Sequence, residues 1–168
     1  MKVVLQLFWQ ICLLRQGPDH VPTQNWFITT VVSANILCSL ALSLVLDDSS
    51  SFISVLTRLV VTQATTAALV WLALFLREQG NRFPATVTAL FGCDLIITVC
   101  FATLVPVVSV IGEGGSTFIF LGFMIWSVAV AGFIMHRALS VPLGIGILIA
   151  VGMMVLSVAT SEVAVNPV

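Results

Sequence analysis

Charged residues are scarce in this sequence. Lysine, arginine, aspartate and glutamate together make up 8% of the 168 residues, whereas 60% of the residues are hydrophobic. A typical soluble domain is about 25% charged and about half apolar. A chain of the present composition has too few polar groups to cover a water-soluble surface. It is therefore predicted to be an integral membrane protein with one membrane domain.

The sequence also lacks the residue patterns of several functional classes. The net charge is −1 and no basic cluster occurs, so nucleic acid is not an expected partner. The four cysteines include no CxxC pair, and His20 and His136 stand alone, so no metal site is expected. None of the common hydrolase, metalloprotease or phosphate-binding motifs occurs. We expect a protein that is not an enzyme and holds no cofactor.

Long apolar stretches are what the sequence does contain. Five of them are each long enough to cross a bilayer, which takes roughly 20 helical residues. We expect the spans at about 26–46, 52–76, 84–111, 117–135 and 142–160, with Pro106 kinking the third span. The predicted fold class is all-α: a polytopic bundle of five transmembrane helices in residues 26–168, ending in a short polar tail from Ser161.

Residues 1–25 are predicted to form an amphipathic helix at the membrane interface, followed by a linker. Lys2, Gln6 and Gln10 recur at every fourth position, which places them on one stripe of a helix whose other side is apolar. Gly17 and Pro18 are expected to end this helix.

The distribution of positive charge predicts the orientation. Cytoplasmic loops of membrane proteins are enriched in lysine and arginine. Five cations fall on the side of the N-terminus, and only Arg58 falls on the other: Lys2, Arg15, Arg77, Arg82 and Arg137. We therefore expect a cytoplasmic N-terminus, a periplasmic or lumenal C-terminus, and an acidic turn at Asp47–Asp48 that faces outward.

One carboxylate, Asp94, lies near the middle of the third span. A charged group at that depth costs about 2.5–3.5 kcal/mol on insertion scales, so Asp94 is expected to face protein or water. By depth, Gln63 is expected to be its best partner and Asn35 the next, whereas Arg58 is about 14 Å away by helical rise. Asp94 is predicted either to tie the third span to a neighbouring helix or to act as a proton carrier or cation ligand.

Small and polar residues predict helix packing. Small side chains four residues apart let membrane helices approach closely, either inside one bundle or against a partner. They are found in the second and fifth spans, at Ala64, Ala68, Gly144, Gly146, Ala150 and Gly152. Polar side chains in the second span are expected to form hydrogen bonds between helices: Thr62, Gln63, Thr65 and Thr66.

Three short stretches carry a resemblance to a known family. They are Leu13–Pro22, which contains Arg-Gln-Gly-Pro; Gly80–Leu90, which leads into the third span; and Trp126–Leu139, the fourth span with its turn. These stretches, and the order of an amphipathic start followed by five close spans, resemble the Yip domain family of Ypt/Rab-interacting membrane proteins and their bacterial relatives. The resemblance implies a non-enzymatic protein of a bacterial inner membrane.

The sequence therefore predicts an integral membrane scaffold or assembly factor. Its expected partners are membrane lipids and other membrane proteins, or a second copy of the chain. The alternative hypothesis is a small transporter or proton-coupled channel, or a subunit of a larger transport complex, that uses Asp94.

Overall fold

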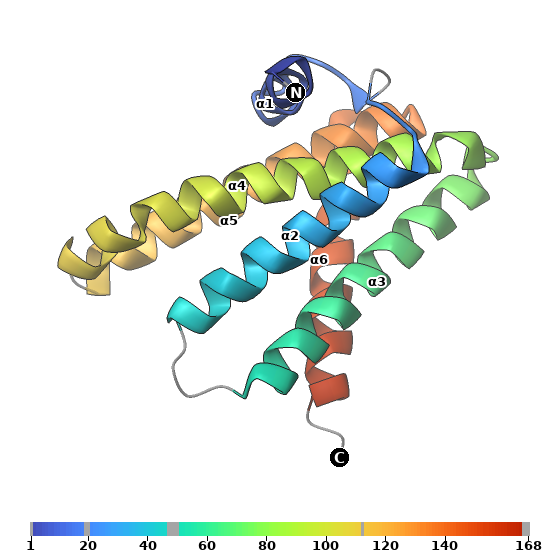
Figure 1. Cartoon of the computed structure of the whole chain (residues 1–168). Helices are drawn as coiled ribbons and strands as arrows, with labels where there is room; N and C mark the ends of the chain where they lie inside the picture. The colour runs from blue at the N-terminus through green and yellow to red at the C-terminus, as the bar shows by residue number, and fades with distance from the viewer. Residues whose placement is uncertain (1, 19–20, 47–50, 112, 166–168) are drawn as a thin grey trace.

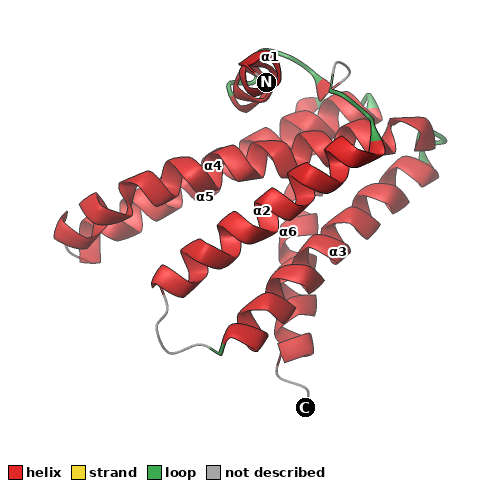
Figure 2. Cartoon of the chain, viewed as in Figure 1, coloured by secondary structure: helices red, strands yellow, loops and turns green. Residues whose placement is uncertain are grey.

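The computed structural model describes residues 2–18, 21–46, 51–111 and 113–165, and the regular structure in these ranges is helical, without a strand (Figure 1, Figure 2). The elements follow one another along the chain as α1 (Lys2–Cys12), α2 (Asn25–Leu46), α3 (Phe52–Leu76), η2 (Gly80–Arg82), α4 (Phe83–Ile111), α5 (Glu113–Leu139) and α6 (Leu143–Val165). Five helices, α2 to α6, are long and apolar enough to cross a membrane. The predicted all-helical fold with five membrane spans is confirmed at this level.

The helices are long because their apolar composition places them in the hydrocarbon of a membrane. In hydrocarbon no water is present to bond a free backbone group, so an uninterrupted apolar segment satisfies its backbone by remaining helical. Helix α4 has 29 residues and continues through Pro106. At 1.5 Å per residue it is about 43 Å long, so it exceeds a hydrocarbon core of about 30 Å and either tilts or extends into the headgroup region.

Two predicted boundaries of the spans are wrong. Helix α5 begins at Glu113, so the glycine-rich run 112–116 is a much shorter interruption than expected. Helix α6 extends to Val165, so Ser161 and Glu162 belong to the helix and not to a polar tail. In both places glycine or polar residues have a low helix propensity. Contacts with neighbouring helices, and the need to keep backbone groups hydrogen-bonded in the membrane, outweigh it.

The helices pack in a defined set of neighbours. Helix α4 lies beside α5, α5 beside α6, α6 beside α3, and α2 lies against α4 and α3. In Figure 1 the helices come together near η2 and spread toward the opposite end, where the α4–α5 hairpin and α6 point in different directions. At the end where they meet, Arg82 Nη1 donates to Arg137 O at 3.3 Å and to Ala138 O at 3.5 Å. This end therefore links the α3–α4 turn to the α5–α6 turn.

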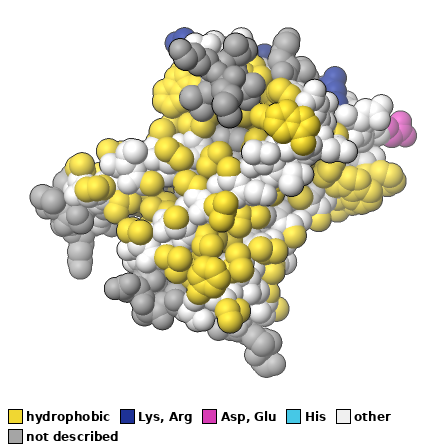
Figure 3. Space-filling view, viewed as in Figure 1, with side chains coloured by type: hydrophobic (Ala, Val, Ile, Leu, Met, Phe, Trp, Pro, Cys, Tyr) yellow, Lys and Arg dark blue, Asp and Glu magenta, His cyan; other side chains and the backbone are white. Residues whose placement is uncertain are grey.

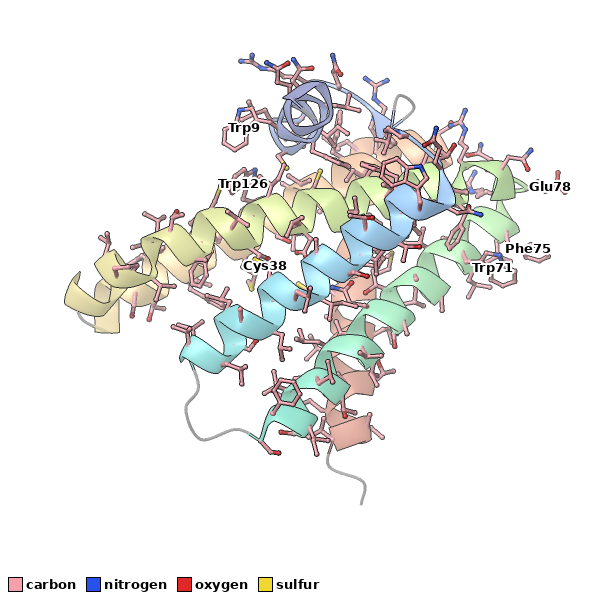
Figure 4. The ribbon with its side chains drawn as sticks, in the orientation of Figure 1. Trp9, Cys38, Trp71, Phe75, Glu78 and Trp126 are labelled. Atoms are coloured by element: carbon pink, nitrogen blue, oxygen red, sulfur yellow. The ribbon has the colours of Figure 1, made fainter. Side chains whose placement is uncertain are left out.

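Helix α1 packs on the outer surface of α4 and α5. Phe8 and Cys12 are buried there, and Trp126 Nε1 donates to Cys12 O at 3.0 Å. A Cβ atom at Gly92 would lie 2.4 Å from a Phe8 ring carbon, so the close approach of α1 to α4 depends on this glycine. Trp9 and Gln6 are exposed, and together with Leu95 and Val99 of α4 they line an apolar pocket beside α1; Figure 4 shows Trp9 at the side of α1.

The charged side chains on the face shown in Figure 3 gather beside α1 and the α3–α4 turn, and the helices away from that end are covered by hydrophobic and uncharged groups. This separation agrees with a bundle that is embedded in a membrane. The predicted acidic turn Asp47–Asp48, together with His20, lies outside the described residues.

Candidate functional site

Asp94 is held on α4 by an amide from α2. The side chain of Asn35 is 0% exposed, and its Nδ2 donates to Asp94 Oδ2 at 2.9 Å and to Phe91 O at 3.2 Å. Both N–H groups of the amide are thereby used, which fixes the orientation of Asn35. Its Oδ1 accepts a hydrogen bond from Gln63 Nε2 at 2.5 Å.

These contacts form a directed chain of donors from α3 through α2 to α4. Gln63 donates to Asn35, Asn35 donates to Asp94, and the carboxylate is the final acceptor. The expected order of partners is therefore reversed, because Asn35 bonds Asp94 directly and Gln63 reaches it only through Asn35. Depth along the spans predicted that the three residues meet, but it gave no information about which side of each helix faces the others.

The second carboxylate oxygen of Asp94 has no hydrogen-bond partner among the described residues. Asp94 is half-buried and lines a cavity of about 210 Å³ between α3, α4, α5 and α6. The cavity wall carries further polar groups from three of these helices: Gln63, Thr62, Thr66, Ser127 and Ser157. Among the described residues that line it, Asp94 is the only carboxylate, and none is a lysine, arginine or histidine.

Three of the four polar residues predicted in the second span, Gln63, Thr65 and Thr66, form hydrogen bonds between helices, whereas Thr62 lines the cavity. Thr66 Oγ1 lies 2.9 Å from Ser157 Oγ, and Thr65 Oγ1 lies 3.2 Å from Thr160 Oγ1, both across the α3–α6 contact. Ser157 and Ser127 also line the cavity, although neither was predicted as a site residue from the sequence. A serine in an apolar helix gives little signal until the neighbouring helix is known.

Arg58 does not take part in the Asp94 site. Its Nη2 lies 3.3 Å from Glu162 Oε1, and both side chains are about half exposed, at 52% and 49%. This ion pair joins the start of α3 to the end of α6. Arg58 therefore has a carboxylate partner within the chain. Its long side chain can also extend toward the lipid headgroups.

The predicted small residues divide into two groups. Gly146 and Ala150 are buried on α6; Gly146 meets α5, and Ala150 lines the cavity. A Cβ atom at Gly146 would lie 2.5 Å from Gly132 O and 2.8 Å from His136 N, so these two backbones touch only because Gly146 has no side chain. Gly132, which the sequence analysis missed, has the matching role on α5, where a Cβ atom would lie 2.8 Å from Ile147 Cα.

The other four predicted small residues face outward. Ala64 and Ala68 on α3 are exposed, and so are Gly144 and Gly152 on α6. A Cβ atom added at Gly144 or Gly152 would meet no other atom within 4 Å. These positions do not pack the bundle, and they remain available on its surface.

Among the described residues, no three histidine, cysteine, aspartate or glutamate side chains come together as metal ligands would. The described cysteines are all free thiols. Cys12 and Cys93 are both buried between α1 and α4, where Cys12 Sγ lies 3.8 Å from Cys93 O and Cys93 Sγ lies 3.9 Å from Phe8 O.

Comparison with known proteins gives no relative from which a function could be transferred. The chain matches no protein family, no curated protein and no solved structure.

Proposed function

We propose that the chain is a non-enzymatic membrane scaffold or assembly factor that holds a transmembrane helix of a partner membrane protein against one side of α3. The observation that carries the proposal is the α3 outer face, which we define as Val60, Ala64, Ala68, Trp71 and Phe75. These residues recur at spacings of three and four, so they share one side of the helix. All five are exposed, although α3 contacts α2, α4 and α6 on its other sides.

The chemistry of the α3 outer face suits a helix better than lipid alone. Ala64 and Ala68 form a small-xxx-small pair, and such pairs let two helix backbones approach closely where lipid gives no hydrophobic drive. Ala64 lies about 18 Å from Leu76 along the helix axis, which places the pair near mid-membrane. At that depth, close packing against another helix gives more favourable van der Waals contact than flexible lipid chains give.

An aromatic pair marks the end of the same face. The rings of Trp71 and Phe75 stack with centroids 5.2 Å apart and an angle of 15° between their planes. Figure 4 shows both side chains on the outside of α3, pointing away from the other helices. Aromatic side chains are enriched at the membrane–water interface, so this pair fixes the level at which a partner helix would lie.

The arrangement of charges supports the orientation that belongs to this proposal. Arg77 and Arg82 belong to the α3–α4 turn, and Arg137 lies in the last turn of α5 beside it. We place this end in the cytoplasm by the positive-inside rule, with α1 as an interfacial helix beside it. A bacterial inner membrane and membership of the Yip domain family rest on the resemblance of the sequence.

The scaffold is tested by comparing partner recovery between matched variants. The chain is expressed at native level, extracted into nanodiscs, and the co-purifying membrane proteins are quantified by mass spectrometry. Replacing Ala64 and Ala68 by leucine pushes an opposing helix away, so recovery of a stoichiometric partner should fall by at least about tenfold, or about 1.4 kcal/mol.

The matched control is Gly122→Leu on α5. Gly122 is also exposed, and a Cβ atom there would meet nothing within 4 Å, but its neighbours four residues away are the large side chains of Phe118 and Trp126. This variant should retain the partner. Equal recovery from the double leucine variant and the wild type, or a wild type that yields no stoichiometric partner, would overturn the proposal.

A second candidate function is a carrier that uses Asp94. The specific observation in its favour is the cavity beside the free carboxylate oxygen near mid-membrane. In reconstituted liposomes a carrier would lose solute or proton flux in the Asp94→Asn variant while keeping its fold. A scaffold would retain its partner in that same variant.

A further inference from the structure

The cavity between α3, α4, α5 and α6 has the properties of a ligand site in its own right, independent of the α3 outer face. Asp94 lies about 16 Å along α4 from Phe83, so the cavity is near the middle of the membrane. Its volume of about 210 Å³ corresponds to roughly seven waters at about 30 Å³ each. An apolar cavity of about 150 Å³ in another protein accepts benzene, so the space here suffices for a ring of that size with a small substituent.

The charge of the cavity wall determines which charge a ligand should carry. Within the part of the chain that the structure describes, Asp94 is the only carboxylate of the lining, and no cationic side chain of the lining compensates it. Of the described cations, Arg58 is already paired with Glu162. A partly buried carboxylate that faces no compensating charge is costly, and a bound positive charge reduces that cost. The cavity therefore favours a cation over a neutral or anionic molecule of the same shape.

The hydrogen-bonding groups select an N–H donor. Oδ2 of Asp94 is used by Asn35, while Oδ1 accepts no hydrogen bond from the described residues. The Nε2 of Gln63 is used by Asn35 as well, which leaves its Oε1 as a second acceptor on the same wall. Because Asn35 is fixed by its three contacts, these acceptors are held in place before a ligand enters, which reduces the cost of binding.

The rest of the wall argues for an organic cation and against a bare metal ion. Calcium and magnesium take six or more oxygen ligands, and a single carboxylate with scattered hydroxyls does not supply them. Most of the lining is apolar, with Leu90, Ile97, Val130, Ile134 and Met153 around the space. A ligand that matches both parts has an ammonium group at one end and a compact apolar body at the other.

We propose that this cavity binds a small primary or secondary organic amine in its protonated form, with the ammonium N–H groups donating to Asp94 Oδ1 and the apolar body lying between α4, α5 and α6. Amine binding at this site needs no partner protein, so it can be tested independently of the scaffold function.

The test uses benzylammonium, with benzyl alcohol as a neutral probe of similar shape. Binding to the full chain in nanodiscs is measured by isothermal titration calorimetry. Benzylammonium should bind saturably with one site per chain, and benzyl alcohol should bind at least tenfold more weakly. The Asp94→Asn variant, which keeps the shape of the side chain, should weaken benzylammonium binding at least tenfold and remove the preference over the alcohol.

A second variant keeps the test decisive if Asp94→Asn does not fold. Ala131 lines the cavity, and Ala131→Leu fills part of the space without changing any charge, so it should also abolish binding. Gly122→Leu places the same side chain on the exposed side of α5, outside the lining, and should leave the affinity unchanged. Equal affinities for the amine and the alcohol, or an unchanged affinity in Ala131→Leu, would overturn the proposal.

Discussion

Replacing Asn35 by leucine tests whether the Asn35–Asp94 contact holds α2 against α4. Leucine has a similar size, so the substitution removes the amide without opening a large cavity. It removes the hydrogen bonds to Asp94 Oδ2, Phe91 O and Gln63 Nε2. Hydrogen bonds between membrane helices contribute about 0.6 kcal/mol on average and up to about 1.7 kcal/mol. Three of them therefore correspond to a loss of about 2–5 kcal/mol in the free energy of unfolding.

The assay is reversible unfolding in mixed micelles, followed by tryptophan fluorescence. A double-mutant cycle with Asn35→Leu and Asp94→Leu isolates the direct contact, for which we expect a coupling of about 0.6–1.7 kcal/mol. Thr30→Val is the control, because Thr30 Oγ1 bonds only to Trp26 O in its own helix and is exposed, so its effect should stay within about 0.5 kcal/mol. If the two leucine substitutions add within about 0.3–0.5 kcal/mol, Asn35 and Asp94 do not interact and the arrangement of the site is wrong.

Two further predictions concern the contacts of α6 and α1. Gly146→Ala should destabilise the fold by about 1–3 kcal/mol, because the added carbon overpacks the contact with α5. Gly144→Ala, whose added carbon meets no other atom, should be neutral or slightly stabilising. Thermal unfolding of both variants checks this, and equal melting temperatures would contradict it. Treatment with copper phenanthroline should join Cys12 to Cys93 in a disulfide that peptide mass spectrometry detects, because each thiol lies against the backbone of the other helix, and two thiols that remain fully alkylatable would contradict the packing of α1 on α4.

Composition and run length alone predicted the five spans, because a helix in hydrocarbon is selected by the continuity of its apolar residues. The second span was predicted from Phe52 to Leu76, as observed. The errors at Glu113 and Glu162 occurred where polar residues or glycines interrupt that continuity and where a contact with another helix decides. For Glu162 the contact is the ion pair with Arg58.

The site was predicted only in part, because the sequence gives the depth of a residue in the membrane more readily than its direction. Depth alone brought Asn35, Gln63 and Asp94 to one level. Which helix faces which depends on tilt and crossing angle, and these follow from close contacts such as that of Gly146 with α5. The same limit explains why Gly146 and Gly152 appeared equivalent in the sequence, although one is buried and the other exposed.

Site-specific photo-crosslinking in native membranes tests the central claim most directly. A photoreactive amino acid is placed at Ala68 on the α3 outer face and, as a control, at the exposed Gly122 on α5. A scaffold that holds a partner helix on α3 should give one discrete product of higher mass from Ala68 and none from Gly122. Lipid adducts alone at both positions would contradict the proposed function.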